Sequence, residues 1–352
     1  MSDPIPDLEP VRVWMDEQGL GRGRPFEEAR LLAGGTQNVM VRFRRGDRSY
    51  VLRRGPRHTR ATTDKSLLRE IRVLEALADT AVPHPALIAA CPDRNVLGDS
   101  VFYLMAPVDG LNAVNELSAR HRESAAVRHD MGLRMVDALA ALHAVDPEQV
   151  GLGDMGHPDG FHERQVRRWL SELDAYNELS GYEGHAIPGL AQVADWLDNN
   201  LPRHPRPGLM HGDFHVANVM FEHGGPDVAA IVDWEMCTVG DPLLDLGWLL
   251  SLWREPGQDT DLLDSALSKA GGMATPDELI ERYASHGVRD VTELDWYRVL
   301  ACFKLGIILE GTYARSRAGK APPELGTWMR DRTTRLFERA HALIAASGRQ
   351  AG

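Results

Sequence analysis

Polar side chains interrupt an apolar stretch of the sequence at residues 209–221, LMHGDFHVANVMF. Those whose chemistry and spacing could support a reaction are His211, Asp213, His215 and Asn218. Three interpretations are open: a polar turn between two buried strands, a metal site with the two histidines and the aspartate as ligands, and a catalytic loop. Single histidines and aspartates belong more often to turns than to active sites, so the rest of the chain has to decide.

A second polar insertion follows fifteen residues after Asn218. Residues 228–232, VAAIV, have the composition of a buried strand, and Asp233 comes directly after them. A carboxylate at the end of an apolar strand projects into whatever cleft the strand faces. Carboxylate and amide oxygens suit Mg²⁺, whereas a zinc site favours histidine or cysteine at short range. This weighs against a metal-dependent hydrolase built on His211, Asp213 and His215, which stays a weaker alternative.

The composition is that of a globular protein of about two domains or lobes, with 352 residues, 43% hydrophobic and 26% charged. No segment approaches the run of about twenty apolar residues that a membrane helix requires. The first ten residues, MSDPIPDLEP, are acidic and proline-rich, unlike a signal peptide. Three scattered cysteines indicate neither a disulfide framework nor a zinc knuckle. We therefore expect a cytoplasmic protein without a membrane partner.

The net charge of −12 is unevenly distributed along the chain. Residues 1–105 hold 16 basic and 14 acidic side chains, and the remainder holds 23 basic and 37 acidic ones. Because phosphate backbones repel an acidic surface, the larger part of the chain argues against nucleic acid as the main partner. Nothing in the composition indicates an oligomeric state.

The first third of the chain has the patterns of a small β-rich unit. Residues 39–53 alternate between apolar and polar side chains around a Gly-Asp turn, which predicts a hairpin. The preceding residues 33–38, AGGTQN, form a flexible entry whose backbone can approach a ligand closely. A helix is predicted for residues 63–78, with Glu70 beside its apolar face. A short strand at residues 101–105 completes the unit.

Residues 106–110, APVDG, lead into a larger unit of helical character. Helices are predicted there at residues 124–145, 161–176, 243–253, 260–270, 277–286, 292–313 and 323–346. Asp241 before Pro242 suits a helix start with the aspartate as N-cap. Asp245 lies in an apolar run and needs a buried partner. A β-rich unit followed by a helical one predicts an α+β fold.

The spacing H-G-D-x-x-x-x-N at residues 211–218, followed by I-V-D at residues 231–233, resembles the catalytic and metal loops of the protein-kinase-like fold. The similarity is to its aminoglycoside phosphotransferase-like branch and covers nearly the whole chain. It implies a bilobal α+β fold with a nucleotide-binding lobe at residues 1–105, a hinge at 106–110 and a catalytic and substrate-binding lobe at 111–352. The cofactors that it implies are ATP and Mg²⁺.

The resemblance assigns roles in the larger lobe. Asp213 would orient a substrate hydroxyl and accept its proton, while Asn218 and Asp233 would bind magnesium. His211 would brace the loop, His215 would face substrate or solvent, and the aspartate at position 245 would support the loop. Phosphoryl transfer requires mainly the positioning of reactants and the neutralisation of charge, which suits these residue types.

In the small lobe, Gly35 and Thr36 would belong to the phosphate-covering loop. Arg53 would replace the usual lysine, contacting the α- and β-phosphates and pairing with Glu70. The carbonyl of Ala106 and the N–H of Val108 would bind adenine at the hinge; residue 107 is a proline, but no donor is required there.

Departures from the protein-kinase pattern restrict the function further. The expected phosphate-covering loop at residues 33–38 lacks the G-x-G-x-x-G pattern, Asp233 precedes Trp-Glu instead of Phe-Gly, and no A-P-E segment occurs. These differences argue against a protein kinase and favour a small-molecule kinase that phosphorylates a hydroxyl group. A non-catalytic, nucleotide-binding pseudokinase is the alternative, because arginine stands at position 53.

The sequence leaves several classes of phosphate acceptor open. The small-lobe pattern is closest to kinase-like domains associated with acyl-CoA dehydrogenases, which implies a hydroxyacyl-CoA. The basic run at residues 53–60 would then meet phosphates of ATP or of CoA, unless it is a solvated loop. An acidic larger lobe instead favours a polycationic, aminoglycoside-like acceptor. An amino alcohol would require an aromatic cage; the candidates are Trp169, Trp248, Trp253, Tyr313 and Trp328.

Overall fold

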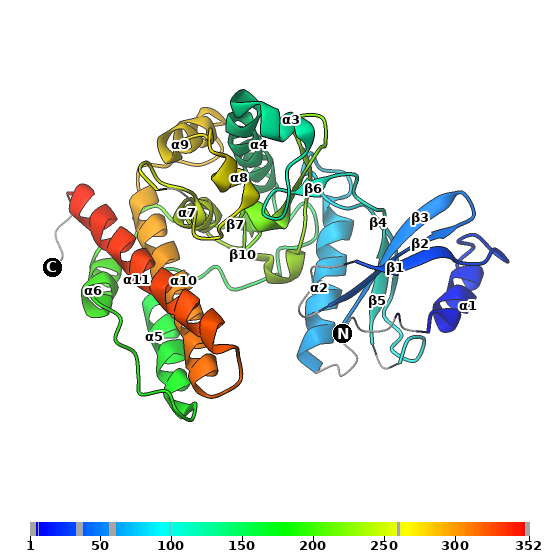
Figure 1. The fold of residues 1–352 in the computed structure, drawn as a ribbon, viewed down its shortest axis with the longest axis horizontal. Coiled ribbons are helices and arrows are strands. Elements are labelled where there is room, and N and C mark those ends of the chain that lie inside the picture. The colour runs from blue at the N-terminus through cyan, green and yellow to red at the C-terminus, as the bar shows by residue number, and fades with distance from the viewer. Residues whose placement is uncertain are drawn as a thin grey trace.

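The computed structural model describes residues 5, 7–32, 38–55, 61–98, 100–258 and 261–348. A small lobe built on an antiparallel sheet lies beside a larger lobe made mainly of helices (Figure 1). The predicted bilobal α+β fold is confirmed. None of the helices in these ranges is long and apolar enough to cross a membrane.

The small lobe contains a five-stranded sheet of order β1-β2-β3-β5-β4. Its strands are β1 (Glu27–Leu31), β2 (Val39–Arg45), β3 (Arg48–Arg54), β4 (Leu87–Cys91) and β5 (Phe102–Met105), and helix α1 (Glu9–Glu17) packs against it. The predicted hairpin is β2–β3, turning at Gly46 with φ of +60°. In the register of this sheet, Arg53 of β3 pairs with Tyr103 of β5. Arg53 therefore lies on the central strand of this sheet.

Helix α2 (Ala61–Leu77) connects the two lobes. Its buried face, which includes Leu67 and Leu74, joins the hydrophobic core of the large lobe. The helix also contacts the short 3₁₀ turn Trp234–Met236 that follows Asp233. Glu70 of α2 is 2% exposed, so the packing of this helix fixes a carboxylate between the lobes.

The large lobe surrounds two small sheets with helices. Its helices are α3 (Ala119–Glu123), α4 (Ala125–His143), α5 (Gln165–Ala175), α6 (Leu190–Asn199), α7 (Leu243–Leu252), α8 (Ala266–Ala270), α9 (Pro276–Ser285), α10 (Leu294–Arg317) and α11 (Pro323–Ala346). The sheets are β10-β7, from Thr238–Gly240 and Gly208–Met210, and β6-β8-β9, from Leu111–Asn112, Val219–Phe221 and Val228–Ile231. These sheets carry the polar loops recognised in the sequence.

One predicted helix start and one predicted N-cap are corrected. Of the helix expected at residues 260–270, the described part is helical only over α8, because Ser265 caps it by accepting the N–H of Ser268. Helix α7 begins at Leu243, as predicted, but Pro242 and not Asp241 occupies the N-cap position. The Asp241 carboxylate still accepts the N–H of Leu243 at 3.2 Å, so it satisfies a helix-start donor from just outside the helix.

Candidate active site

The polar loop at residues 211–215 lies between strands of the two small sheets. Strand β7 leads into it, and β8 follows after the 3₁₀ turn Val216–Asn218. Strand β10 pairs with β7, and β9 pairs with β8. The apolar flanks of the sequence are thus buried strands, and the polar side chains lie together where those strands end.

The carboxylate of Asp213 is fixed by three side-chain donors. Its Oδ1 accepts from Trp248 Nε1 at 2.9 Å and from His215 Nε2 at 3.2 Å. Its Oδ2 accepts from Asn218 Nδ2 at 3.0 Å. Burial disfavours the charged form, but these donors and the nearby histidines hold the pKa of Asp213 below its ordinary value. The side chain is still 35% exposed, so an ionised, oriented carboxylate is accessible to a ligand.

The two histidines of this loop turn in different directions. His215 Nδ1 accepts the N–H of Ala217 at 3.2 Å, which assigns the proton to Nε2, the donor to Asp213. His211 Nδ1 accepts the N–H of Asp213 at 3.3 Å, and its Nε2 donates to the carbonyl of Val232 at 3.0 Å. His211 therefore braces the loop, as the sequence predicted.

These orientations argue against the metal-hydrolase interpretation. The ring nitrogens of His211 are bonded to the backbone, so this histidine does not converge with Asp213 and His215 on one point. Across the described ranges, no group of three or more His, Cys, Asp or Glu side chains could hold a metal ion. His215, which was expected to face substrate or solvent, instead positions the aspartate.

Asp245 on α7 anchors the loop from beneath. Its Oδ2 accepts the N–H of His211 at 2.6 Å, and its Oδ1 accepts that of Gly212 at 2.8 Å. Gly212 has a φ of +86°, and a Cβ there would lie 2.5 Å from the carbonyl oxygen of Met236. The buried partner that Asp245 required is therefore the loop backbone, at a position that only glycine fits.

We expect Asp245→Asn to lower the free energy of unfolding by about 2–3 kcal/mol, since charge-assisted hydrogen bonds are lost and an amide N–H faces a backbone donor. Urea denaturation measures this change. Asp277→Asn, at the exposed start of α9, is the matched control and should have little effect. Equal unfolding free energies for the two variants would contradict the anchoring role.

Asn218 contacts Asp213 and is bonded through its backbone to the residue that precedes Asp233. The Asn218 amide nitrogen donates to the main-chain and side-chain oxygens of Asp213, at 2.9 and 3.0 Å, which leaves Oδ1 free to accept. The N–H of Val232 donates to the Asn218 carbonyl at 2.9 Å, which holds Asp233 nearby. Asp233 has a φ of +67°, an uncommon conformation for a residue with a side chain. An amide oxygen and a carboxylate are suitable ligands for Mg²⁺.

Arg53 lies between two carboxylates. Its Nε is 2.9 Å from Glu70 Oε2, and a terminal guanidinium nitrogen donates to Asp233 Oδ1 at 2.9 Å. The Glu70 pair is a close ion pair without well-directed hydrogen-bond geometry. Burial raises the pKa of Glu70 to about 7, against the attraction of Arg53. The predicted pairing of Arg53 with Glu70 is confirmed, and the contact with Asp233 is an additional finding.

In the connection at residues 106–110, the expected hinge, two backbone groups have no hydrogen-bond partner among the described residues. The N–H of Ala106 donates to the carbonyl of Ala86 at 2.8 Å. Among the described residues, nothing hydrogen-bonds to the Ala106 carbonyl or the Val108 N–H, the two groups expected to bind adenine. Gly35 and Thr36 of the expected phosphate-covering loop lie outside the described residues, as do residues 56–60 of the basic run.

Comparison with known proteins identifies the family. Residues 28–281 match the phosphotransferase enzyme family. The chain belongs to this family. Among curated proteins, it is 30% identical to mouse acyl-CoA dehydrogenase family member 10 over 82% of its length, and 31% identical to chicken acyl-CoA dehydrogenase family member 11 over 84%. It spans only 26% and 38%, respectively, of those longer relatives.

Solved structures of the phosphotransferase family share this fold. A candidate aminoglycoside phosphotransferase from Ralstonia eutropha superposes with a TM-score of 0.77 and 27% identity, covering 96% of this chain and 98% of that one. A thermostable mutant of aminoglycoside phosphotransferase APH(4)-Ia, in complex with AMP-PNP and hygromycin B, gives a TM-score of 0.59 at 15% identity, covering 95% and 99%. At that identity the second likeness concerns the fold alone.

This phosphotransferase-family chain also contains a buried lysine that the sequence analysis missed. Lys304 of α10 is 8% exposed, and its Nζ lies 4.5 Å from the ring centre of Trp248 and 5.5 Å from that of Trp169. Burial lowers the pKa of Lys304, while the carboxylates of Asp213 and Asp245 oppose this shift. A charged residue within the buried run ACFKLGIIL was the available signal.

The surroundings of Lys304 also show whether the candidate aromatic residues form a cage for a cationic amino alcohol. Trp169 and Trp248 do come together, but around this cation of the chain itself. The remaining candidates have other partners: Trp253 donates to the carbonyl of Ala274, Tyr313 faces Arg330 and Trp328 faces Arg332. The five aromatic residues therefore do not form one cage for a cationic amino alcohol in this phosphotransferase.

Proposed function

We propose that the protein is an ATP- and Mg²⁺-dependent phosphotransferase that moves the γ-phosphoryl group to a hydroxyl of a small molecule. The observation that carries this proposal is the carboxylate of Asp213, fixed by Trp248, His215 and Asn218 yet partly exposed. Membership of the phosphotransferase family supports the reaction class. In this proposal the small lobe binds the nucleotide, residues 106–110 form the hinge, and the large lobe binds the acceptor.

Asp213 is the catalytic residue of this proposal. Its ionised carboxylate accepts a hydrogen bond from the acceptor hydroxyl and aims the oxygen at the phosphoryl group. With a lowered pKa it is a weak base, so it receives the hydroxyl proton late, as the bond to phosphorus forms. His215 and Trp248 are positioning residues, because their hydrogen bonds to Oδ1 of Asp213 restrict the rotation of its carboxylate.

The nucleotide would lie between the lobes. Ala106 and Val108 bind adenine through the backbone groups that face no partner, and Arg53 contacts the α- and β-phosphates. The Asn218 Oδ1 and the Asp233 carboxylate hold magnesium. The chemistry that magnesium supplies when bound is neutralisation of charge on the phosphates. A phosphate-covering role for Gly35 and Thr36 stays part of the proposal.

For the acceptor, we favour a hydroxyacyl-CoA over an aminoglycoside-like compound. The curated relatives that match this chain are members of the acyl-CoA dehydrogenase family, although the chain covers only part of them. Trp248, which donates to Asp213, lies against the ammonium group of Lys304, which would repel a cationic acceptor at that point.

A non-catalytic, nucleotide-binding module is the second candidate, and one observation favours it. Arg53 is bonded to Asp233, so a phosphate anchor and a metal ligand neutralise each other in this structure. Nucleotide binding alone fits both candidates. Acceptor-dependent release of ADP separates them: we expect it with at least one of a panel of hydroxyacyl-CoAs, aminoglycosides and amino alcohols. Binding of ATP without ADP release for any of these acceptors would favour the pseudokinase.

We expect Arg53→Ala to weaken ATP binding by about tenfold to over a hundredfold, since a charge-assisted phosphate contact contributes roughly 1.5–3 kcal/mol. Arg53→Lys should recover part of this loss, because a point charge replaces a planar fork. Glu70→Gln should have a smaller effect, since Asp233 still orients the guanidinium. Isothermal titration calorimetry measures the affinities.

Arg48→Ala, on the same strand but exposed, is the matched control for the Arg53 series. Its ATP affinity should equal that of the parent. Parental affinity in Arg53→Ala as well would show that the phosphate anchor lies elsewhere in the small lobe.

A further inference from the structure

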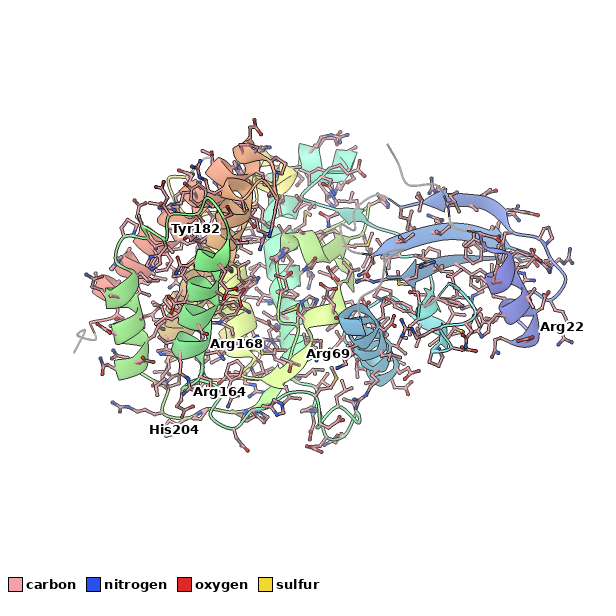
Figure 2. The ribbon with its side chains drawn as sticks, turned by 90° about the horizontal axis from the view of Figure 1, so that it is seen from below. Arg22, Arg69, Arg164, Arg168, Tyr182 and His204 are labelled. Atoms are coloured by element: carbon pink, nitrogen blue, oxygen red, sulfur yellow. The ribbon has the colours of Figure 1, made fainter. Side chains whose placement is uncertain are left out.

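A cavity of about 630 Å³ lies where α2, α5 and β10 meet. Its volume is in the range of small-molecule binding sites. Five basic side chains line it, against one acidic one: Lys65, Arg69, Arg72, Arg164 and Arg168, with Asp154. Figure 2 shows Arg69 on α2 on one side, and Arg164 and Arg168 at the start of α5 on the other. The chain after residue 105 has an excess of acidic residues, so this concentration of positive charge is not a property of the whole lobe.

Among the described residues, few carboxylates pair with this positive charge. Arg72 pairs with Asp154 at 2.6 Å, the one carboxylate of the cavity. Arg164 donates only to backbone carbonyls, those of His157 and Asp159. Within the described ranges, Arg69 and Arg168 form no ion pair; Arg168 instead lies over the ring of Trp169, 5.4 Å from its centre. Like charges held together repel each other, and a bound anion would relieve this repulsion.

The cavity adjoins the catalytic loop through two of its walls. On one wall, Trp169 Nε1 donates to Gln165 at 3.4 Å, and Trp169 and Trp248 share Lys304. Trp248 in turn donates to Asp213. The β10 wall includes Val239, which pairs with the strand that leads into the loop. A ligand group in the cavity would thus lie on the acceptor-binding lobe, away from the hinge where adenine is expected.

We propose that this cavity binds phosphate groups carried by the acceptor, an inference that rests on the proposed phosphotransferase function. Arginine suits this role, because its planar fork donates two hydrogen bonds to phosphate oxygens. Arg69 and Arg168 approach from opposite walls, and neither forms an ion pair with another described residue. The acceptor class is therefore a hydroxylated compound with phosphate esters or a diphosphate, and a polycationic acceptor is disfavoured at this site.

The test uses coenzyme A as a phosphate-bearing probe and the full chain saturated with AMP-PNP and Mg²⁺, so that the nucleotide site is filled. Isothermal titration calorimetry compares the parent with Arg69→Ala, Arg168→Ala and the double variant. Each single change should weaken coenzyme A binding about tenfold or more. Arg167→Ala is the matched control, because Arg167 is exposed on the same helix and does not line the cavity.

A second titration with pyrophosphate distinguishes acceptor-borne phosphate from a free anion. Coenzyme A binding that depends on Arg69 and Arg168 supports the proposal. Binding of pyrophosphate with no binding of coenzyme A would overturn it, as would equal coenzyme A affinities in the parent and the double variant. Because binding requires no turnover, a failure of the phosphotransferase assignment would leave this result intact: coenzyme A would still bind, but no acceptor would be phosphorylated.

Discussion

Asp213→Ala abolishes phosphoryl transfer and leaves nucleotide affinity nearly unchanged: this is the largest effect that the structure predicts. The carboxylate lies on the large lobe, held by Trp248 and His215, and among the described residues it has no hydrogen bond or ion pair with Arg53 or residues 106–110. Loss of a positioned base costs about 10²–10⁴-fold in rate. Turnover with the acceptor found by screening measures the first effect, and titration with AMP-PNP measures the second.

Asp195→Ala is the control for this variant, since Asp195 is an exposed aspartate on α6. It should retain parental turnover. Asp213→Asn is a useful companion, because its amide keeps the size of the side chain while removing the charge that His215 and Asn218 face. Comparable transfer rates in Asp213→Ala and the parent would remove Asp213 from the mechanism.

Asp233→Asn should lose most of the magnesium-dependent increase in ATP affinity. Asparagine is chosen because it tolerates the left-handed backbone at this position, where φ is +67°, so the change removes charge with little backbone strain. Two consequences combine: the proposed metal site loses its only carboxylate, and Arg53 loses one of its two anionic partners. Transfer should fall with the loss of bound metal.

Titration of ATP with and without Mg²⁺ measures this effect in parent and variant. The parent should bind ATP more tightly when magnesium is present, and Asp233→Asn should show little difference between the two conditions. In the absence of magnesium the variant should bind ATP at least as well as the parent, because Arg53 is freer to contact phosphate. An unchanged magnesium effect would place the metal on other ligands.

Local sequence patterns were sufficient for the core of the candidate site. Asp213 and Asn218 lie five residues apart within one loop, so their contact follows from the chain path. The pairing of Arg53 with Glu70 was also predicted, because it follows from the resemblance in strand and helix order. The contact between Arg53 and Asp233 was not: it joins residues 180 positions apart and depends on the backbone turn at Asp233.

Several helices and strands were not predicted from the sequence, and the physical reasons differ between them. Strand β4, LIAAC, is rich in alanine and lacks the alternation that marks a half-buried strand. Helix α6 did carry a helical signal, since its buried residues Leu190, Val193 and Leu197 share one face. The role of Lys304 could not be predicted locally, because its two tryptophans come from α5 and α7.

The membership of the two hydrophobic cores does not follow the order of residues along the chain. Helix α2 precedes the hinge in sequence, yet Leu67 and Leu74 belong to the core of the large lobe. This packing places Glu70 against Arg53 on one side of the helix. Arg69, the next residue along the chain, lines the basic cavity. Helix α2 therefore connects the proposed nucleotide and acceptor sites, a relation that no pattern within the helix reveals.

The most direct test of the phosphotransferase proposal follows the phosphate itself. The parent is incubated with Mg²⁺, ATP labelled at its γ-phosphate, and hydroxyacyl-CoAs, aminoglycosides or amino alcohols in separate reactions. We predict that the label is recovered in an ester at the hydroxyl of one acceptor class, hydroxyacyl-CoA, and that Asp213→Ala yields none. Label that stays in ATP, or is found only in inorganic phosphate with every acceptor, would contradict the proposal.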